Sequence, residues 1–116
     1  MPDLPYKRVV VKLTGESLAS NGDPISPEAI SFVAGELEEV RALGVDLCVV
    51  VGGGNIVRGA QLSKNDGIER VVADHMGMMA TVINALALSS ILRGRGLETR
   101  VQTAIEIKMV AEPAIR

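Results

Sequence analysis

The chain is poor in the residues on which several common kinds of site depend. Its 116 residues include one cysteine and one histidine, so an internal disulfide is impossible and a zinc site built from protein ligands alone has too few donors. His75 also has no catalytic partner that spacing identifies. Cys48 lies in an apolar stretch, where we expect a small buried residue in a reducing cytoplasm.

Aromatic residues and excess positive charge are equally scarce. Aromatics make up 2% of the chain, and the formal net charge is −2. Nucleic-acid binding is not expected, because the chain has no basic run and no interleaved aromatic residues to stack on bases. The hydrophobic fraction of 47% must come from aliphatic residues and methionine, which favours buried parallel strands.

We expect neither a secretory signal nor a membrane partner. Residues 1–6 contain two prolines and an aspartate where a signal would need an apolar segment. The apolar run 76–92 is shorter than the roughly 20 residues of a membrane span and is interrupted by glycine, threonine, asparagine and serine. It predicts a helix buried in the core or against another subunit, with its methionines packed there, in a soluble cytoplasmic protein.

The order of apolar and turn residues predicts one small α/β domain with a mainly parallel sheet. A helix is indicated by Ser26 as N-cap, Pro27 at the first helical position and apolar residues at helical spacing up to Gly44. The apolar strand after it has no polar face, so we expect burial on both faces. The expected elements are a strand at 8–13, a turn at 20–24, this helix, a strand at 45–51, a long helix from near Glu69 or Asp74 to Gly94 or Gly96, and a strand at 99–105, with no complete element assigned to 106–116.

Glycine turns follow the first two predicted strands, at Gly15 and at 52–54. In a strand–helix–strand unit both turns emerge at the carboxyl edge of the sheet, where open α/β sheets bind ligands. Glycine lets backbone N–H groups approach phosphate oxygens. Neither a Walker loop nor the GxGxxG spacing of dinucleotide-binding folds is present.

Four residues near these turns are candidates for binding or structure. Lys12 either offers its ammonium to an anion at the first turn or extends into solvent from a strand end. Arg58 follows the triple glycine closely enough to reach a phosphate, or is solvated. Asp74 is either the N-cap of the long helix or a ligand-binding carboxylate, and we expect His75 to be structural.

These motifs resemble, in order and spacing, those of the bacterial uridylate (UMP) kinases of the amino acid kinase superfamily. The pair formed by GGGNxxRG and DHMGM is specific, because other members such as acetylglutamate kinase usually lack the second motif. The resemblance runs from about residue 6 to residue 115. The segments that carry it are KLTGE at 12–16, VVGGGN at 50–55 with RG at 58–59, DHMGM at 74–78 and RVQTAI at 100–105.

The resemblance implies a three-layer αβα fold and transfer of the ATP γ-phosphoryl group to UMP, with Mg²⁺ bridging phosphates. It implies that Lys12 and Arg58 are catalytic, and that Gly53 and Asp74 contact UMP. It also implies a homohexamer regulated by GTP and UTP. The residues implied to contact ATP are Lys12, Leu13, Thr14, Gly15, Gly54 and Arg58.

The chain departs from the family in length. Family members are roughly twice as long, and their second half supplies a UMP-phosphate segment, the adenine pocket and further catalytic residues. Residues 1–116 are therefore expected to be the amino-terminal half of an amino acid kinase domain. Two alternatives remain, namely another amino acid kinase that acts on a carboxylate or carbamate, and a non-catalytic nucleotide-binding or assembly module.

Overall fold

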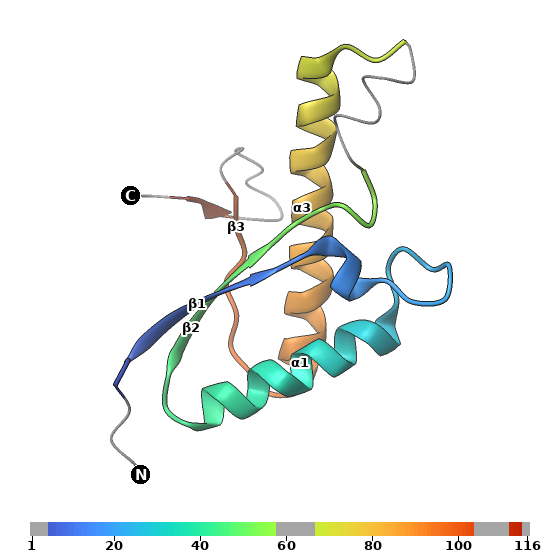
Figure 1. The fold of residues 1–116 in the computed structure, drawn as a ribbon. Helices are drawn as coiled ribbons and strands as arrows, with labels where there is room; N and C mark the ends of the chain where they lie inside the picture. The colour runs from blue at the N-terminus through green and yellow to red at the C-terminus, as the bar shows by residue number, and fades with distance from the viewer. Residues whose placement is uncertain (1–4, 58–66, 104–111, 115–116) are drawn as a thin grey trace.

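The computed structural model describes residues 5–57, 67–103 and 112–114, and it contains strands, two long helices and one short 3₁₀ helix (Figure 1). The strands predicted at 8–13 and 45–51 and the first helix are confirmed to within about a residue. The elements in chain order are β1 (Arg8–Leu13), η1 (Gly15–Leu18), α1 (Pro27–Ala42), β2 (Asp46–Val51), α3 (Arg70–Gly94), β3 (Gln102–Thr103) and β4 (Glu112–Pro113).

The sheet is parallel, as predicted. β1 pairs with β2 from Arg8↔Asp46 to Leu13↔Val51, with α1 forming the crossover between them. The strand predicted at 99–105 is shorter in the structure, which assigns only β3, and residues 104–105 lie outside the described part. In the tail, where no element was assigned, β4 pairs in parallel with β3.

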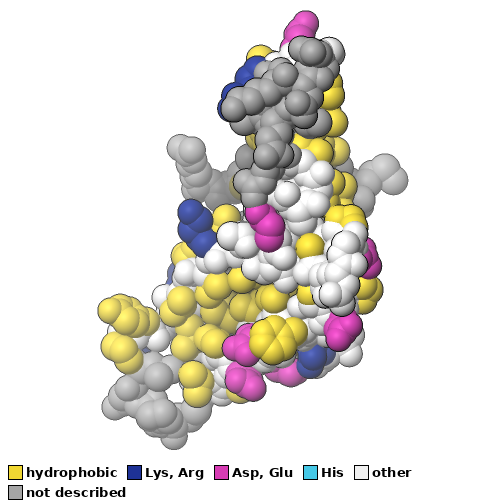
Figure 2. All heavy atoms as spheres, turned by 45° about the vertical axis from the view of Figure 1, so that its right-hand side comes forward, with side chains coloured by type: hydrophobic (Ala, Val, Ile, Leu, Met, Phe, Trp, Pro, Cys, Tyr) yellow, Lys and Arg dark blue, Asp and Glu magenta, His cyan; other side chains and the backbone are white. Residues whose placement is uncertain are grey.

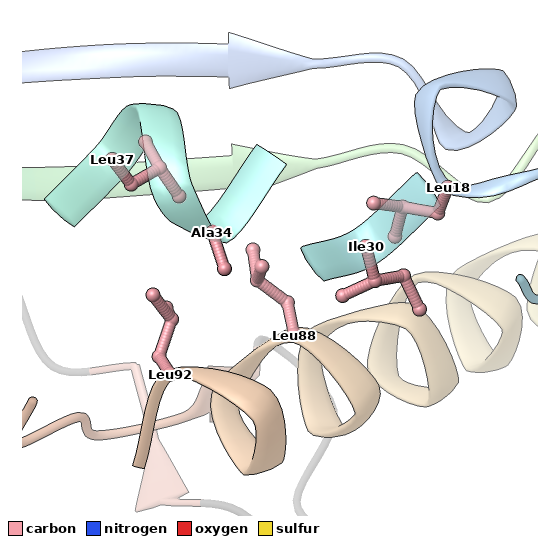
Figure 3. Packing of buried hydrophobic residues seen from close by; sticks show 6 residues of the cluster. All are labelled: Leu18, Ile30, Ala34, Leu37, Leu88 and Leu92. Carbon is pink, nitrogen blue, oxygen red and sulfur yellow. The ribbon is translucent and has the colours of Figure 1, made fainter. Parts of the chain in front are cut away.

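The core lies where α1, α3 and η1 meet one face of the β1–β2 sheet. Leu18, Ile30 and Ala34 are each at most 1% exposed. Figure 3 shows this cluster, in which α1 side chains point toward the α3 side chains beneath them. Partly buried residues of both strands pack against it, so the two long helices cover the same face of the sheet. The six buried residues of the cluster are Leu18, Ile30, Ala34, Leu37, Leu88 and Leu92.

The first long helix begins where the sequence predicts. The Ser26 side chain accepts a hydrogen bond from the Ala29 N–H at 3.1 Å, and Pro27 occupies the first helical position. Ile30 and Leu37 turn into the core, while the acidic residues on the other side remain at the surface. The capped and amphipathic character read from the sequence therefore sets both the start and the orientation of α1.

The other face of the β1–β2 sheet is open in the described structure, which corrects the prediction for β2. Burial alternates along both strands, and Val10 and Val50 are 64% and 49% exposed. Cys48 lies on this face and is exposed, not buried. A continuous apolar run predicts burial on both faces only if a second layer is present, and no second layer covers this face among the described residues.

Helix α3 begins at Arg70, which confirms the predicted start near Glu69 and not the one at Asp74, and it is less buried than predicted. Its N-cap is Glu69, and its amino-terminal part extends beyond the sheet (Figure 1). By length and composition alone it could cross a membrane, with a mean hydropathy of 1.5 over its most apolar window. Core helices of soluble proteins meet the same criteria, and α3 contacts α1, β2 and η1. Its exposed apolar residues include all three methionines expected to pack, Met76, Met78 and Met79, together with Val71, Val72 and Ile83.

Candidate active site

The two glycine turns meet at the carboxyl edge of the sheet. The Gly52 N–H donates to the Leu13 carbonyl at 2.9 Å, so the pairing of the strands continues into the turns. A Cβ atom on Gly15 would lie 2.7 Å from the Gly54 nitrogen and would overlap the Asn55 side chain. Close contact between the turns therefore requires glycine at position 15.

Backbone donors gather at this edge. The N–H groups of Gly53, Gly54 and Asn55 have no hydrogen-bond acceptor among the described residues. The first turn is held by its own contacts, since the Ser17 N–H donates to the Thr14 carbonyl at 3.1 Å and the two hydroxyl oxygens lie 3.1 Å apart. Consecutive free N–H groups on a constrained turn can bind an anion such as a phosphate.

The second turn is packed tightly against the middle of α3. A Cβ atom on Gly53 would lie 2.8 Å from the Ala80 Cβ atom and 3.1 Å from the Gly77 carbonyl oxygen. Two of the nearest three atoms belong to helix backbone, which cannot move aside without bending the helix. Gly53 was predicted to let a ligand approach the backbone, and its missing side chain also lets α3 pack against the turn.

We expect Gly53→Ala to destabilise the fold by about 1–3 kcal/mol, the usual cost of overpacking. Gly35→Ala is the matched control, because its new Cβ would meet nothing closer than an arginine nitrogen at 3.7 Å and alanine favours the helix. Urea unfolding should therefore give a lower midpoint for Gly53→Ala and an equal or higher one for Gly35→Ala. Equal midpoints for the two variants would mean that the turn does not depend on this contact.

A pair of asparagines connects the second turn to α3 and to the loop before α1. The Asn84 amide donates to the Gly52 carbonyl at 2.8 Å and to Asn55 Oδ1 at 2.6 Å. Asn55 in turn donates to Asn84 Oδ1 at 3.0 Å and to the Pro24 carbonyl at 2.6 Å. Sequence reasoning treated Asn84 only as an interruption of an apolar run, although a polar residue within such a run was itself the available signal.

Lys12 lies beside the glycine edge but on the open face of the sheet. It is the last residue but one of β1, is paired in register with Val50, and is exposed. No acidic side chain of the described residues forms an ion pair with it. Its side chain is thus exposed at the strand end and accessible to an anion, which is compatible with both of its predicted roles.

Asp74 is not the N-cap of α3, which corrects one of its two predicted roles. It lies inside the helix, one turn after Arg70, and its carboxylate accepts a hydrogen bond from Arg70 Nε at 3.0 Å in an exposed ion pair. Residues at i, i+3 and i+7 share a helix face, so Asp74 shares a face with Gly77 and Thr81, which both contact the second turn. Asp74 precedes Ala80 by six residues, so the two residues are about 9 Å apart along the helix axis.

Of the two remaining candidates, the structure describes only His75. Arg58 lies outside the described residues. His75 is exposed on α3, and no three His, Cys, Asp or Glu side chains cluster to hold a metal within the described part of the chain. The site therefore consists of free backbone N–H groups at Gly53–Asn55, packed against Gly15, with one lysine on the open face of the sheet and one carboxylate on the neighbouring helix.

The profile of the amino acid kinase family matches residues 7–114, nearly the whole chain. The chain belongs to the amino acid kinase family. The uridylate kinase of Rubrobacter xylanophilus is 55% identical over 113 residues, which are 97% of this chain and 44% of that protein. That of Pediococcus pentosaceus is 51% identical over 117 residues, which are 100% of this chain and 48% of that protein.

Among solved structures, this amino acid kinase chain is similar to two bacterial UMP kinases. The UMP kinase of Bacillus anthracis superposes with a TM-score of 0.88 at 41% identity, covering 97% of this chain and 46% of that one. The UMP kinase of Ureaplasma parvum gives 0.86 at 34% identity, with 95% and 48% covered. This chain thus spans about half the length of the relatives it matches.

Proposed function

We propose that this chain carries the nucleoside-monophosphate half of a UMP kinase, which transfers the γ-phosphoryl group of ATP to UMP and gives UDP. The observation that carries the proposal is the contact between the two glycine turns, which forms one anion cradle from segments nearly 40 residues apart. Similarity to proteins named uridylate kinase supports UMP as the acceptor. The term complete enzyme is used below for this chain joined to the carboxyl-terminal half that its relatives possess.

Each predicted site residue has a role in this proposal. Phosphoryl transfer asks a protein mainly to position the reactants and to stabilise charge on the phosphoryl oxygens. Leu13 and Thr14 lead into Gly15 and, with Gly54, would border ATP, whereas Gly53 and Asp74 would contact UMP. Lys12 and Arg58 would supply cations, and Mg²⁺ would be held by the phosphates, with no ligand from the described residues.

We further propose that the enzyme is a soluble, cytoplasmic homo-oligomer, a hexamer by family resemblance, with no membrane partner. An exposed apolar stripe on α3 supports subunit contact, since its members recur at spacings of four, three and four residues, as in helix–helix seams. Figure 2 shows hydrophobic side chains along the upright part of the molecule as well as in a broad band lower down. The stripe consists of Val72, Met76, Met79 and Ile83, each 37–48% exposed.

We expect Asp74→Asn to weaken UMP binding to the complete enzyme by about 1.5–3 kcal/mol, because a charged acceptor for the nucleotide is lost. The fold should lose at most about 0.5 kcal/mol, since the ion pair with Arg70 is exposed. Calorimetric titration with UMP measures the first quantity, and urea unfolding measures the second.

Arg70→Gln is the matched control, because it removes the same ion pair and keeps the Asp74 carboxylate. Its UMP affinity should equal that of the parent. Unchanged affinity in Asp74→Asn would contradict a role for this carboxylate in binding UMP. If the parent itself shows no preference for UMP over carboxylate or carbamate substrates, the proposed acceptor is wrong.

A further inference from the structure

Asn84 is a fully buried polar residue in an apolar helix. Its side-chain amide forms hydrogen bonds only with residues distant in sequence, Gly52 and Asn55. A buried amide in a helix interior is costly unless it is hydrogen-bonded. Here both amide hydrogens and the amide oxygen have partners, and all of these partners belong to the second glycine turn.

The orientation of both amides is fixed by backbone carbonyls. Because a carbonyl can only accept, the Gly52 oxygen requires the Asn84 nitrogen, and the Pro24 oxygen requires the Asn55 nitrogen. With these orientations, the amide nitrogen of each asparagine donates to the amide oxygen of the other. This arrangement connects α3 to the second turn, and through Asn55 to the loop before α1.

The first turn belongs to the same assembly. Gly15 packs directly onto the Asn55 side chain and onto the Gly54 backbone, so a change at Asn55 reaches both turns. The three N–H groups proposed to bind phosphate follow Gly52 immediately, and the carbonyl of Gly52 is the one that Asn84 holds.

We propose that Asn84 is a positioning residue, which acts through Asn55 and Gly52 to hold both glycine turns in the phosphate-binding geometry. It touches no substrate itself. The inference rests on the proposed function for the claim that phosphate binds there, whereas the claim that Asn84 orders the turns stands on the contacts alone.

The first test measures amide hydrogen exchange in the 116-residue chain. Asn84→Asp has nearly the same shape, but an ionised carboxylate cannot donate to the Gly52 carbonyl. We expect exchange at the bonded amides of Gly52, Ile56 and Val57 to accelerate at least tenfold more than exchange in α1. Acceleration by the same factor in both regions, or none, would overturn the proposal, because Asn84 would then contribute only global stability or nothing.

Two further variants keep this test decisive. Ser89→Ala removes a buried α3 hydroxyl whose hydrogen bond goes to Thr99, away from the turns, and should not accelerate the turn selectively. Asn55→Ala breaks the amide pair from the less buried side and should reproduce the turn-selective pattern even if Asn84→Asp fails to fold. A turn unaffected by Asn55→Ala would count against the proposal.

The second test titrates the same chains with UMP and with inorganic tripolyphosphate. We expect Asn84→Asp to bind whichever probe the parent binds at least tenfold more weakly, and Ser89→Ala to bind within twofold of the parent. Unchanged binding by Asn84→Asp would show that phosphate binding does not depend on how well the glycine turns are ordered. If the parent chain binds neither probe, the anion cradle proposed for its two glycine turns is wrong, and hydrogen exchange still decides whether Asn84 positions the turns.

Discussion

Replacing Lys12 by alanine in the complete enzyme should lower kcat by about a hundredfold, while UMP binding stays close to that of the parent. The lysine is the one predicted catalytic cation that the structure describes, and its ammonium group is exposed at the end of β1 beside the glycine edge. Its charge matters most as negative charge develops on the transferring phosphoryl group. Loss of one such electrostatic donor costs roughly 3 kcal/mol in the transition state.

The structure makes this variant easy to interpret. Lys12 has no ion-pair partner among the described residues, and the substitution removes no core side chain, so the stability of the fold should change little. Lys7→Ala is a matched control, because Lys7 is an exposed lysine just before the same strand. Steady-state assays with saturating ATP and Mg²⁺ give kcat, and calorimetry gives UMP affinity. A kcat within threefold of the parent would remove Lys12 from the catalytic machinery.

The parts of the fold that could be predicted are those specified by local sequence. The cap at Ser26, the first helical position at Pro27 and the apolar spacing from Ile30 to Leu37 all act within one helix. Glycine turns that follow two apolar strands were enough to predict a parallel pair of strands whose two turns meet at its carboxyl edge. These signals lie within a few residues of the structure they specify.

The errors concern contacts that local sequence does not specify. A fully apolar strand cannot reveal whether its second face is covered, which is why Cys48 was expected to be buried and is exposed. Asp74 is a good N-cap residue by type and was one of two predicted starts, but the helix begins at Arg70, beside the other predicted start at Glu69. The amide pair of Asn55 and Asn84 joins residues 29 positions apart, and no periodic pattern marks it.

The 116-residue chain alone should not be a competent kinase. In-line transfer requires two nucleotides held against each other, and the described residues provide one cradle at Gly15 and Gly53–Asn55. Lys12 stands on a sheet face where Val10 and Val50 are about half or more exposed, so no wall formed by the described residues holds a second nucleotide beside it. The same open face and the α3 stripe should make the isolated chain self-associate.

The measurement is ADP production from UMP, ATP and Mg²⁺, first with the 116-residue chain and then after addition of a separately produced carboxyl-terminal half. We expect no turnover from the first and partial recovery from the second, because the added half would cover the open sheet face and complete the cradle. Lys12→Ala provides the control for contaminating kinases, since recovered turnover that depends on this chain must fall with that substitution. Sustained turnover by the 116-residue chain at about 1 s⁻¹ or more, a rate typical of kinases, would show that one cradle is enough.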